Sequence, residues 1–178
     1  MYVFDIDDTL FKTSARVKIV NTDSGIEHYK TSEQLKNYSL TCDESASFSE
    51  FKDAEIFCKE SSPIKPMIKV AQACIDKTSQ GSRTIFVTAR SNLNNKNRFI
   101  SYLNSCGLDM RLVRVERAGN YSKLKTSEAK KFIIKRYIES EAYDNVYFFD
   151  DSLDNILSFI ELREHFPSIN LLPKLVLN

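Results

Sequence analysis

Short apolar stretches rich in β-forming residues divide the chain, and longer amphipathic segments lie between them. Four of these stretches are MYVFDI, RTIFVTA, MRLVRVE and NVYFFDD, at residues 1–6, 83–89, 110–116 and 145–151. Their length and composition are typical of strands buried on both faces. LPKLVLN, at residues 172–178, is a candidate for a fifth strand.

The segments between these stretches carry apolar residues at helical spacing. Residues 97–105 predict a helix, because Gly107 follows as a C-cap signal. Further helices are predicted at 64–77, 127–140 and 153–164, the second of these capped by Thr126 or Ser127. Since strands and helices alternate, the pattern predicts an α/β fold: a Rossmann-like parallel sheet with helices on both faces.

The region between the first two predicted strands is too long for a single crossover. Residues 19–30 predict a hairpin around Asp23-Ser24-Gly25. Residues 31–60 are polar but contain aromatic residues, which we expect to form a core of their own: Tyr38, Phe48, Phe51 and Phe57. We therefore predict a core domain formed by 1–14 and 61–178, with a small cap insert at 15–60.

The net charge of +1 over 178 residues does not point to any partner, but the charge is distributed unevenly. Residues 43–60 are mainly acidic. Residues 109–136 are mainly basic and include Arg111, Arg114 and Arg117, so this region either attracts an anionic substrate or is a solvated charged face.

The four cysteines are widely scattered and show no zinc-ligand spacing, and the two histidines have no matching partners. Reduced thiols are the expectation. With no signal-peptide pattern and no apolar segment of membrane-spanning length, we expect a cytoplasmic protein without a membrane partner. The sequence does not indicate an oligomeric state.

Reactive side chains follow three of the predicted strands: Asp5, Asp7, Asp8 and Thr9, then Thr88 and Arg90, then Asp150 and Asp151. Parallel strands end at one edge of their sheet, and that edge holds the active site in open α/β folds. A carboxylate cluster at a buried strand end needs a cation to offset its repulsion. With a lysine from the next helix, these groups predict a magnesium-assisted phosphoryl-transfer site.

Four segments resemble, in order, the motifs of the haloacid-dehalogenase-like (HAD) hydrolase superfamily: FDIDDTL at 4–10, VTAR at 87–90, a lysine near 130, and FFDDSLDN at 148–155. The whole chain, insert included, is also similar to uncharacterised members encoded by tailed bacteriophages. That second resemblance implies no activity; for a viral protein, the expected location is the host cytoplasm.

The resemblance implies a division of roles among these residues. Asp5 would be the nucleophile that forms an aspartyl-phosphate, and Asp7 would protonate the leaving oxygen and then activate water. Thr88 would hydrogen-bond the phosphoryl oxygens, with Ala89 and Arg90 beside it as further substrate-binding residues. Lys130 would neutralise the phosphate, and Lys125 and Lys131 are alternatives for that role.

The metal implied by the resemblance is Mg²⁺. It would be held by the carboxylate of Asp5, the carbonyl of Asp7 and the acids of the fourth strand. Asp151 is expected as the direct ligand with Asp150 just behind it, although the two could exchange roles.

The sequence departs from the family pattern at one position and matches its phosphatase branch at another, and two other interpretations of the acid cluster are disfavoured. Asp8 stands where many family members have glycine, and the retained Asp7 favours phosphatase chemistry over carbon–halogen cleavage. A calcium loop is disfavoured because Leu10 and Arg16 occupy the positions of its glycine and glutamate. A phosphoacceptor receiver domain is disfavoured because its lysine follows the hydroxyl on a later strand, whereas here an acid pair comes last.

The expected function is that of a Mg²⁺-dependent phosphatase acting on a phosphomonoester. Its substrate would be a nucleotide or a nucleic-acid end, as for a polynucleotide 3′-phosphatase. One alternative is a small-metabolite or sugar phosphatase. Another is a non-catalytic HAD-fold binding module that acts on a host factor.

Overall fold

A five-stranded sheet forms the centre of the molecule in the computed structural model, which describes residues 1–31, 34–35 and 38–177. Its strand order is β10-β9-β1-β7-β8, and every neighbouring pair is parallel. The strands are β1 (Tyr2–Phe4), β7 (Thr84–Thr88), β8 (Arg114–Arg117), β9 (Asn145–Asp150) and β10 (Asn170–Leu175). The parallel sheet predicted from the sequence is therefore confirmed.

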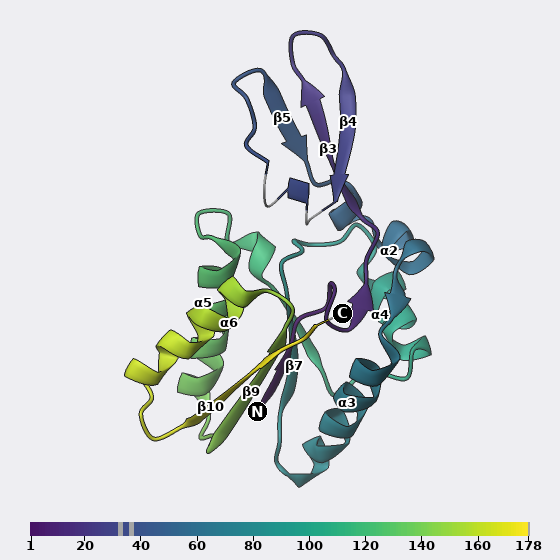
Figure 1. Cartoon of the computed structure of the whole chain (residues 1–178). Coiled ribbons are helices and arrows are strands. Elements are labelled where there is room, and N and C mark those ends of the chain that lie inside the picture. Colours follow the sequence, from purple (N-terminus) through teal and green to yellow (C-terminus); the bar gives the residue numbers. More distant parts are fainter. Residues whose placement is uncertain (32–33, 36–37, 178) are drawn as a thin grey trace.

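Helices cover both faces of this sheet (Figure 1). On one face lie α5 (Thr126–Ser140) and α6 (Leu153–Ile160), and on the other lie α3 (Lys65–Asp76) and α4 (Lys96–Ser105). Successive strand residues point to opposite faces, so each strand supplies two cores. In β1, Phe4 packs with residues of α3 and α4, whereas Val3 packs with residues of α5 and α6.

Several boundaries and one cap differ from the sequence-based prediction. The fifth strand, expected at 172–178, is β10 at Asn170–Leu175, and residue 178 lies outside the described residues. β8 begins at Arg114 rather than at residue 110, because Met110 and Val113 fill the core from an irregular segment before it. The helix expected at 153–164 is α-helical to Ile160 and continues as the 3-10 helix η4 (Glu161–Glu164). Lys125 is the N-cap residue of α5, and no side chain there makes a capping hydrogen bond. The predicted capping by Thr126 or Ser127 was therefore wrong.

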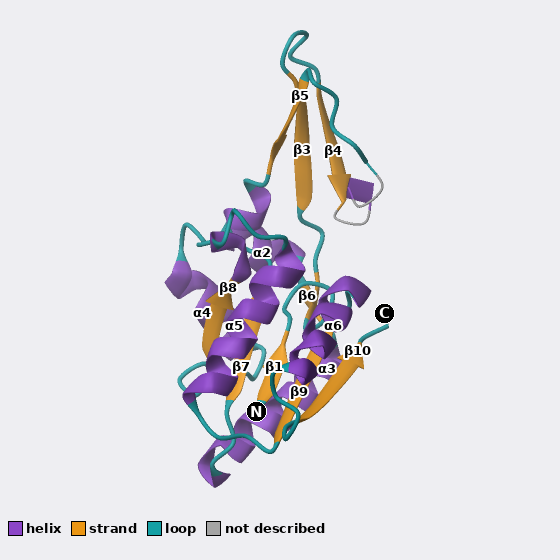
Figure 2. Cartoon of the chain, turned by 90° about the vertical axis from the view of Figure 1, so that its left-hand side faces the viewer, coloured by secondary structure: helices purple, strands orange, loops and turns teal. Residues whose placement is uncertain are grey.

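The segment after the first strand builds a separate antiparallel sheet. We call β3 (Arg16–Asn21), β4 (Glu27–Thr31) and β5 (Glu44–Ser47) the inserted sheet. β3 and β4 form the predicted hairpin, and Gly25 adopts a φ of +71° in its turn. Figures 1 and 2 show the inserted sheet standing beyond one edge of the central sheet. Residues 32–33 and 36–37, within the polar stretch predicted at 31–60, lie outside the described residues.

The chain returns from the insert through the 3-10 helix η1 (Glu50–Lys52) and the helix α2 (Ala54–Glu60). Two-residue strands, β2 (Phe11–Lys12) and β6 (Ser62–Pro63), pair where the chain leaves and re-enters the core. α2 packs against α4 of the core rather than against the inserted sheet. The insert is thus fastened to the core at its base.

Phe57 shows where α2 belongs. Its side chain is 1% exposed, and its ring lies 5.4 Å from that of Phe11 and 4.9 Å from that of Phe99. The prediction that Phe57 belongs to a core within the insert was therefore wrong, because helix α2 carries it into the main core. Among the described residues, no helix has both the length and the apolar character needed to cross a membrane.

We expect Phe57→Ala to lower the free energy of unfolding by about 3–5 kcal/mol, the usual cost of emptying a fully buried phenylalanine site. Urea denaturation monitored by circular dichroism would measure this loss. Phe48→Ala is the matched control: Phe48 is 46% exposed, and its truncation should cost less than about 0.5 kcal/mol. Equal losses in the two variants would contradict the placement of α2 in the core.

Candidate functional site

The loop after β1 is a tight turn that keeps Asp5 at the strand end. Asp5 continues the ladder, since its N–H donates to the carbonyl of Phe149 at 2.9 Å. The N–H groups of Leu10 and Phe11 both donate to the carbonyl of Ile6, at 3.0 and 2.9 Å. Asp8 sits in this turn with a φ of +56°. The left-handed region favours glycine but also admits aspartate, which accounts for Asp8 at a position where glycine was expected.

A buried lysine joins Asp5 to the end of β9. The Nζ of Lys130 lies 2.5 Å from Oδ1 of Asp5 and 2.8 Å from Oδ2 of Asp150. The three residues are only 3%, 2% and 0% exposed, in the order Asp5, Lys130, Asp150. Lys130 comes from the first turns of α5, so this contact ties three elements together. Of the three candidate lysines, Lys130 is the one that reaches Asp5.

Burial and charge act in opposite directions within this cluster. Burial favours the neutral amine of Lys130, but the charges of Asp5 and Asp150 outweigh it and raise the pKa of the lysine. Burial raises the pKa of Asp5, the ammonium of Lys130 opposes this, and the charge of Asp150 adds to it. One ammonium thus serves two carboxylates, and the cluster keeps an excess of negative charge.

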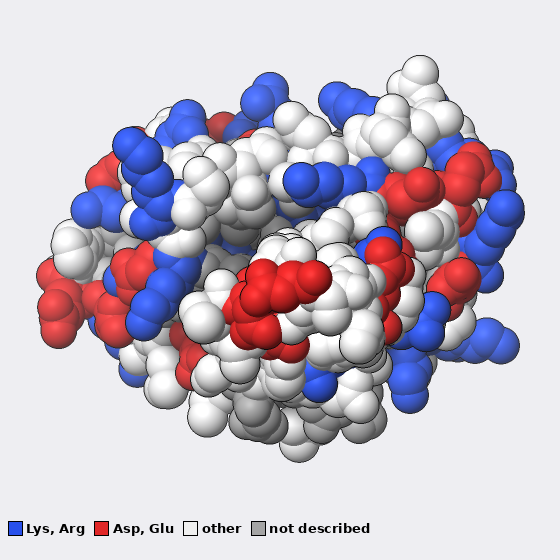
Figure 3. All heavy atoms as spheres, turned by 90° about the horizontal axis from the view of Figure 1, so that it is seen from above, with Lys and Arg blue, Asp and Glu red and all other residues white. Residues whose placement is uncertain are grey.

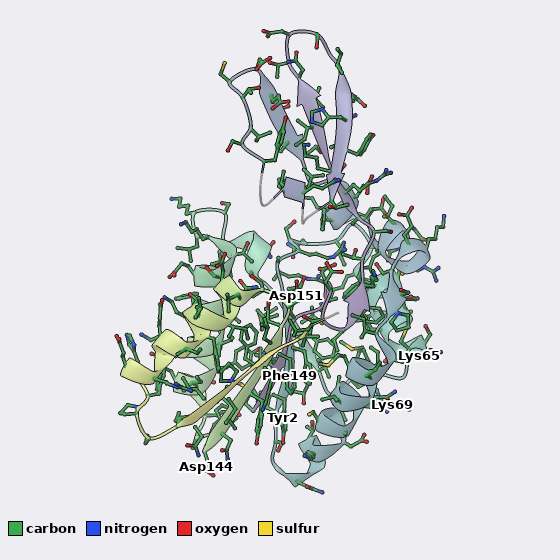
Figure 4. The ribbon with its side chains drawn as sticks, in the orientation of Figure 1. Tyr2, Lys65, Lys69, Asp144, Phe149 and Asp151 are labelled. Atoms are coloured by element: carbon green, nitrogen blue, oxygen red, sulfur yellow. The ribbon has the colours of Figure 1, made fainter. Side chains whose placement is uncertain are left out.

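Asp150 and Asp151 face different surroundings. Asp150 accepts three hydrogen bonds. Its Oδ1 accepts from the N–H of Ser152 and from Nδ2 of Asn155, both at 2.9 Å, and its Oδ2 accepts from Lys130. Asp151 is partly exposed, and it lies at the end of the central sheet next to the inserted sheet, whereas Asp144 lies at the opposite end (Figure 4). Asp150 therefore holds Lys130, Ser152 and Asn155 in position, whereas Asp151 lines the cleft.

The acid cluster suits a hard divalent cation. Carboxylate oxygens of Asp5, Asp150 and Asp151 lie within 4.8 Å of one another. Oxygen ligands and uncompensated negative charge are what Mg²⁺ requires. Asp5, Asp150 and Asp151 are therefore the carboxylates that could hold such a cation.

A second ion pair holds Asp7, two residues beyond Asp5. Arg90 donates to Oδ1 of Asp7 from Nη2 at 2.7 Å and from Nε at 3.0 Å, and Nε also lies 3.0 Å from Oδ2. The Arg90 side chain is fully buried, whereas that of Asp7 is 17% exposed. A forked contact of this kind fixes both the position and the plane of the carboxylate.

Arg90 also links Asp7 to the base of the insert. Its Nη1 donates to the carbonyl of Phe51 at 3.1 Å, and its Nη2 donates to the hydroxyl of Thr13 at 3.1 Å. The guanidinium lies over the rings of Phe51 and Phe57, with its Cζ at 5.0 and 4.8 Å from their centroids. The loop after β1, the loop after β7 and η1 therefore meet at one side chain.

Thr88 lies behind Asp7 rather than in open space. Its hydroxyl donates to Oδ2 of Asp7 at 3.3 Å and accepts from the N–H of Arg90 at 3.1 Å, and the residue is fully buried. Gly119 packs directly against the same loop. A Cβ on Gly119 would lie 2.3 Å from the carbonyl oxygen of Ala89 and 2.7 Å from the nitrogen of Ser91. Glycine at 119 thus sets the position of the loop that carries Arg90.

These groups open into a cleft of about 1240 Å³ between the central sheet and the insert. Figure 3 shows the hollow from above, with Lys and Arg side chains in and beside it. The predicted site residues that line the cleft are Asp5, Asp7, Ala89, Arg90, Lys130 and Asp151. Thr88 and Asp150, both fully buried, are absent from the lining of the described part of the chain.

Several basic residues predicted to meet an anion lie elsewhere. Arg111 pairs with Asp109 at 2.7 Å, and Lys131 pairs with Glu128 and Glu161. Arg117 stacks over the ring of Phe99 with its Cζ at 4.9 Å. Within the described residues, none of these three side chains lines the cleft, nor does Arg114, whereas Lys125 does.

The sequence did not predict the contacts of four residues that complete the site. Thr13 and Phe51 accept from Arg90, Asn155 donates to Asp150, and Gly119 packs against the loop after β7. Asn155 lies within the FFDDSLDN segment, one helical turn after Asp151, which is a usable signal. Phe51 accepts from Arg90 through its backbone carbonyl, and a backbone contact cannot be predicted from the pattern of side chains.

We expect Lys130→Met to lower the free energy of unfolding by about 3–5 kcal/mol near pH 7, because it leaves two buried carboxylates without their cation. The loss should shrink as the pH falls towards 5. Burial raises the pKa of Asp5, whereas the ammonium of Lys130 lowers it, so without Lys130 the pKa of Asp5 rises further. The folded variant then binds a proton at a higher pH than the wild type does, and this narrows the stability difference as the pH falls.

Urea titrations of the wild type and Lys130→Met between pH 5 and pH 8 would measure this difference. Lys131→Met is the matched control, since this neighbouring lysine makes only partly exposed ion pairs. Its loss should stay below about 1 kcal/mol and vary little with pH. A deficit in Lys130→Met that does not change across the range would contradict the buried cluster.

Comparisons with known proteins add no assignment to this geometry. No family model matches the chain, and no curated protein matches it. The arguments for its function therefore rest on the site itself.

Proposed function

We propose that the protein is a Mg²⁺-dependent phosphatase of the HAD type, which hydrolyses a phosphomonoester through an aspartyl-phosphate. The observation that carries this proposal is the pair of acids two residues apart at one strand end. Asp5 is held by Lys130 and Asp7 by Arg90, and both acids line the same cleft. The two carboxylates thus have different partners, as a nucleophile and a proton-transfer group require.

In the first step, a carboxylate oxygen of Asp5 attacks the phosphorus atom. The bond between phosphorus and the leaving oxygen breaks, and Asp7, which must be protonated for this step although it pairs with Arg90 in the structure, gives its proton to that oxygen. Lys130 offsets the repulsion between the phosphate and Asp5 because its ammonium already lies 2.5 Å from the Asp5 carboxylate. The products are an alcohol and a phosphoryl group bound to Asp5.

In the second step, Asp7 takes a proton from water as the water oxygen attacks the phosphorus. The bond between phosphorus and Asp5 breaks, which releases inorganic phosphate and restores both acids. Arg90 is a positioning residue in both steps, since its forked contact orients the Asp7 carboxylate. Thr88 supports the same carboxylate from behind, and in this geometry it acts through Asp7 rather than on the phosphate.

The metal would be held by the carboxylates of Asp5 and Asp151 and by the carbonyl of Asp7. When bound, it would neutralise charge on the phosphate and on the acid cluster. Asp150 supports this arrangement without contacting the metal, because its oxygens accept from Lys130, Ser152 and Asn155. Such supporting partners orient a metal site and tune its affinity.

The inserted sheet stands beyond the central sheet, as a cap would (Figure 2), and residues of both line the cleft. Figure 3 shows the hollow open to solvent from above. An open cleft suits a substrate that extends beyond its phosphate. We therefore favour a nucleotide or a nucleic-acid end over a small metabolite or sugar phosphate.

The decisive experiment is a screen of phosphomonoesters with Mg²⁺, in which phosphate release is measured for the wild type and for Asp5→Asn. We expect activity in the wild type that is lost on chelation of the metal, and a loss of at least about 10³-fold in Asp5→Asn. Asp8→Asn is the control, because Asp8 lies in the same turn three residues after Asp5, and this variant should retain most of the activity. If the wild type releases no phosphate from any substrate, the non-catalytic alternative is correct.

The two acids at the end of β9 should respond differently to the same substitution. We expect Asp151→Asn to keep its stability but to weaken Mg²⁺ binding by at least about tenfold, because it removes a metal-facing charge. Asp150→Asn should instead lose stability, because an amide nitrogen would face the donors of Lys130, Ser152 or Asn155. Calorimetric titration with Mg²⁺ and thermal melting separate the two outcomes, and reversed results would show that the acids exchange roles.

A further inference from the structure

The cleft is larger than the chemistry at Asp5 needs. Its volume of about 1240 Å³ exceeds the range of roughly 300–1,000 Å³ that is typical of pockets for small molecules. The groups that would hold the phosphate and the metal lie at its floor. The remaining volume extends along the insert, so the residues there face the part of the substrate that is not transferred.

One continuous segment of the insert forms this wall. Residues 46–49, 51 and 52 all line the cleft, and they run from β5 into η1. Phe48 is the aromatic residue on this wall with the greater exposure: it is 46% exposed, and its ring lies 6.3 Å from that of Phe51. Phe51 is in turn fixed beneath Arg90. Phe48 thus presents a ring to the cleft from a rigid base.

The acidic residues of the same region face away from the cleft. Each has a partner elsewhere: Asp43 with Asn21, Glu44 with Tyr38, Glu50 with the N–H of Arg16, Asp53 with the first turn of α2, Glu55 with Arg98, and Glu60 with Ser14. None of these six lines the cleft within the described residues. The wall is therefore not acidic, although the local sequence is.

Lysines take the place of these acids on the wall. Lys12 and Lys52 both line the cleft, are exposed, and make no ion pair within 4.0 Å with a described residue. Lys12 adjoins Thr13, and Lys52 adjoins Phe51, which are the two residues that Arg90 binds. Both lysines are therefore next in sequence to residues that contact Arg90, and both line the same cleft as Asp7. Lys125 lines the cleft from the start of α5.

We propose that the cleft binds the end of a single-stranded nucleic acid, with a base stacked on Phe48 and backbone phosphates beside Lys12 and Lys52. An exposed ring next to unpaired lysines is how proteins hold single strands without reading their sequence. The terminal phosphate would lie at Asp5, so the assignment rests on the proposed phosphatase function. The strand itself is recognised by residues that take no part in the chemistry.

The test is the binding of a fluorescently labelled, unphosphorylated oligonucleotide of about six nucleotides, a length within the site sizes of single-strand binders. It is followed by fluorescence anisotropy over a range of salt concentrations. Because this probe has no terminal phosphate, its binding does not depend on catalysis. We expect Phe48→Ala to weaken binding by about tenfold. Lys12→Ala and Lys52→Ala should each reduce the slope of log K against log salt by about one.

Matched controls come from the same molecule. Tyr29→Ala removes an exposed aromatic residue of the inserted sheet that does not line the cleft. Lys69→Ala removes a lysine on α3, far from Asp151 (Figure 4). Neither variant should change oligonucleotide binding. The proposal is overturned if the wild type does not bind the oligonucleotide, if the controls weaken binding as much as Phe48→Ala does, or if a mononucleotide binds equally well with no salt dependence.

The same variants separate this proposal from the phosphatase function. Phe48→Ala should lower the hydrolysis of a 3′-phosphorylated oligonucleotide much more than that of glycerol phosphate, which has no base to stack. Hydrolysis of a 3′-phosphorylated oligonucleotide should fall in Phe48→Ala through a higher KM. Phosphatase activity without oligonucleotide binding would sink the strand-binding proposal alone. Oligonucleotide binding that depends on Phe48, without any phosphate release, would support the proposed surface and remove the phosphatase function.

Discussion

The ammonium of Lys130, buried between Asp5 and Asp150, is the interaction on which the rest of the site depends. Two carboxylates at the ends of adjacent parallel strands repel each other, and in a buried position neither could remain charged alone. Lys130 offsets that repulsion from α5 and so joins the two strands to the helix that covers them. The compensation is incomplete by one charge, and this residual charge is what makes a divalent cation a fitting addition. Stability and chemistry therefore share one cluster.

Arg90 makes a comparable connection on the other side of the site. Its guanidinium is buried, yet each of its nitrogens has an acceptor: Asp7, Thr13 and the carbonyl of Phe51. These acceptors come from the loop after β1 and from the base of the insert. A movement of η1 would therefore shift Arg90 and, with it, the carboxylate of Asp7. The position of the insert and the orientation of the Asp7 carboxylate are thus coupled through one side chain, and Gly119 packs against the loop that carries it.

Much of this arrangement was predictable from the sequence, and the failures have physical reasons. The apolar strands, each ending in acids or hydroxyls, identified the parallel sheet and the end of it where Asp5 and Asp150 meet, because hydrophobic patterning is a local signal. Lys130 was one of three candidate lysines near the start of α5, and only the fold shows that it is the one that contacts Asp5. Phe57 was misplaced because aromatic content does not tell which core a residue joins. Asp150 and Asp151 are adjacent and chemically identical, and the sequence does not show that Asp150 is the one that is fully buried and bonded to Lys130. The tie from Arg90 to Phe51 runs through a backbone carbonyl, which no side-chain pattern encodes.

The distribution of charge in the cleft follows from the same constraint. The buried acids at the floor are matched with buried cations, Asp5 with Lys130 and Asp7 with Arg90, because unpaired buried charges are costly. The acids of the insert are matched with partners outside the cleft. The rest of the cleft lining includes the exposed Lys12 and Lys52, the ring of Phe48, and the acids Asp8, Asp151 and Asp154. The two lysines make no ion pair with a described residue, which costs little at an exposed position. Phe48, Lys12 and Lys52 belong neither to the main core nor to the ion pairs at the floor of the cleft, and this is why we propose them as the surface that binds the rest of a substrate.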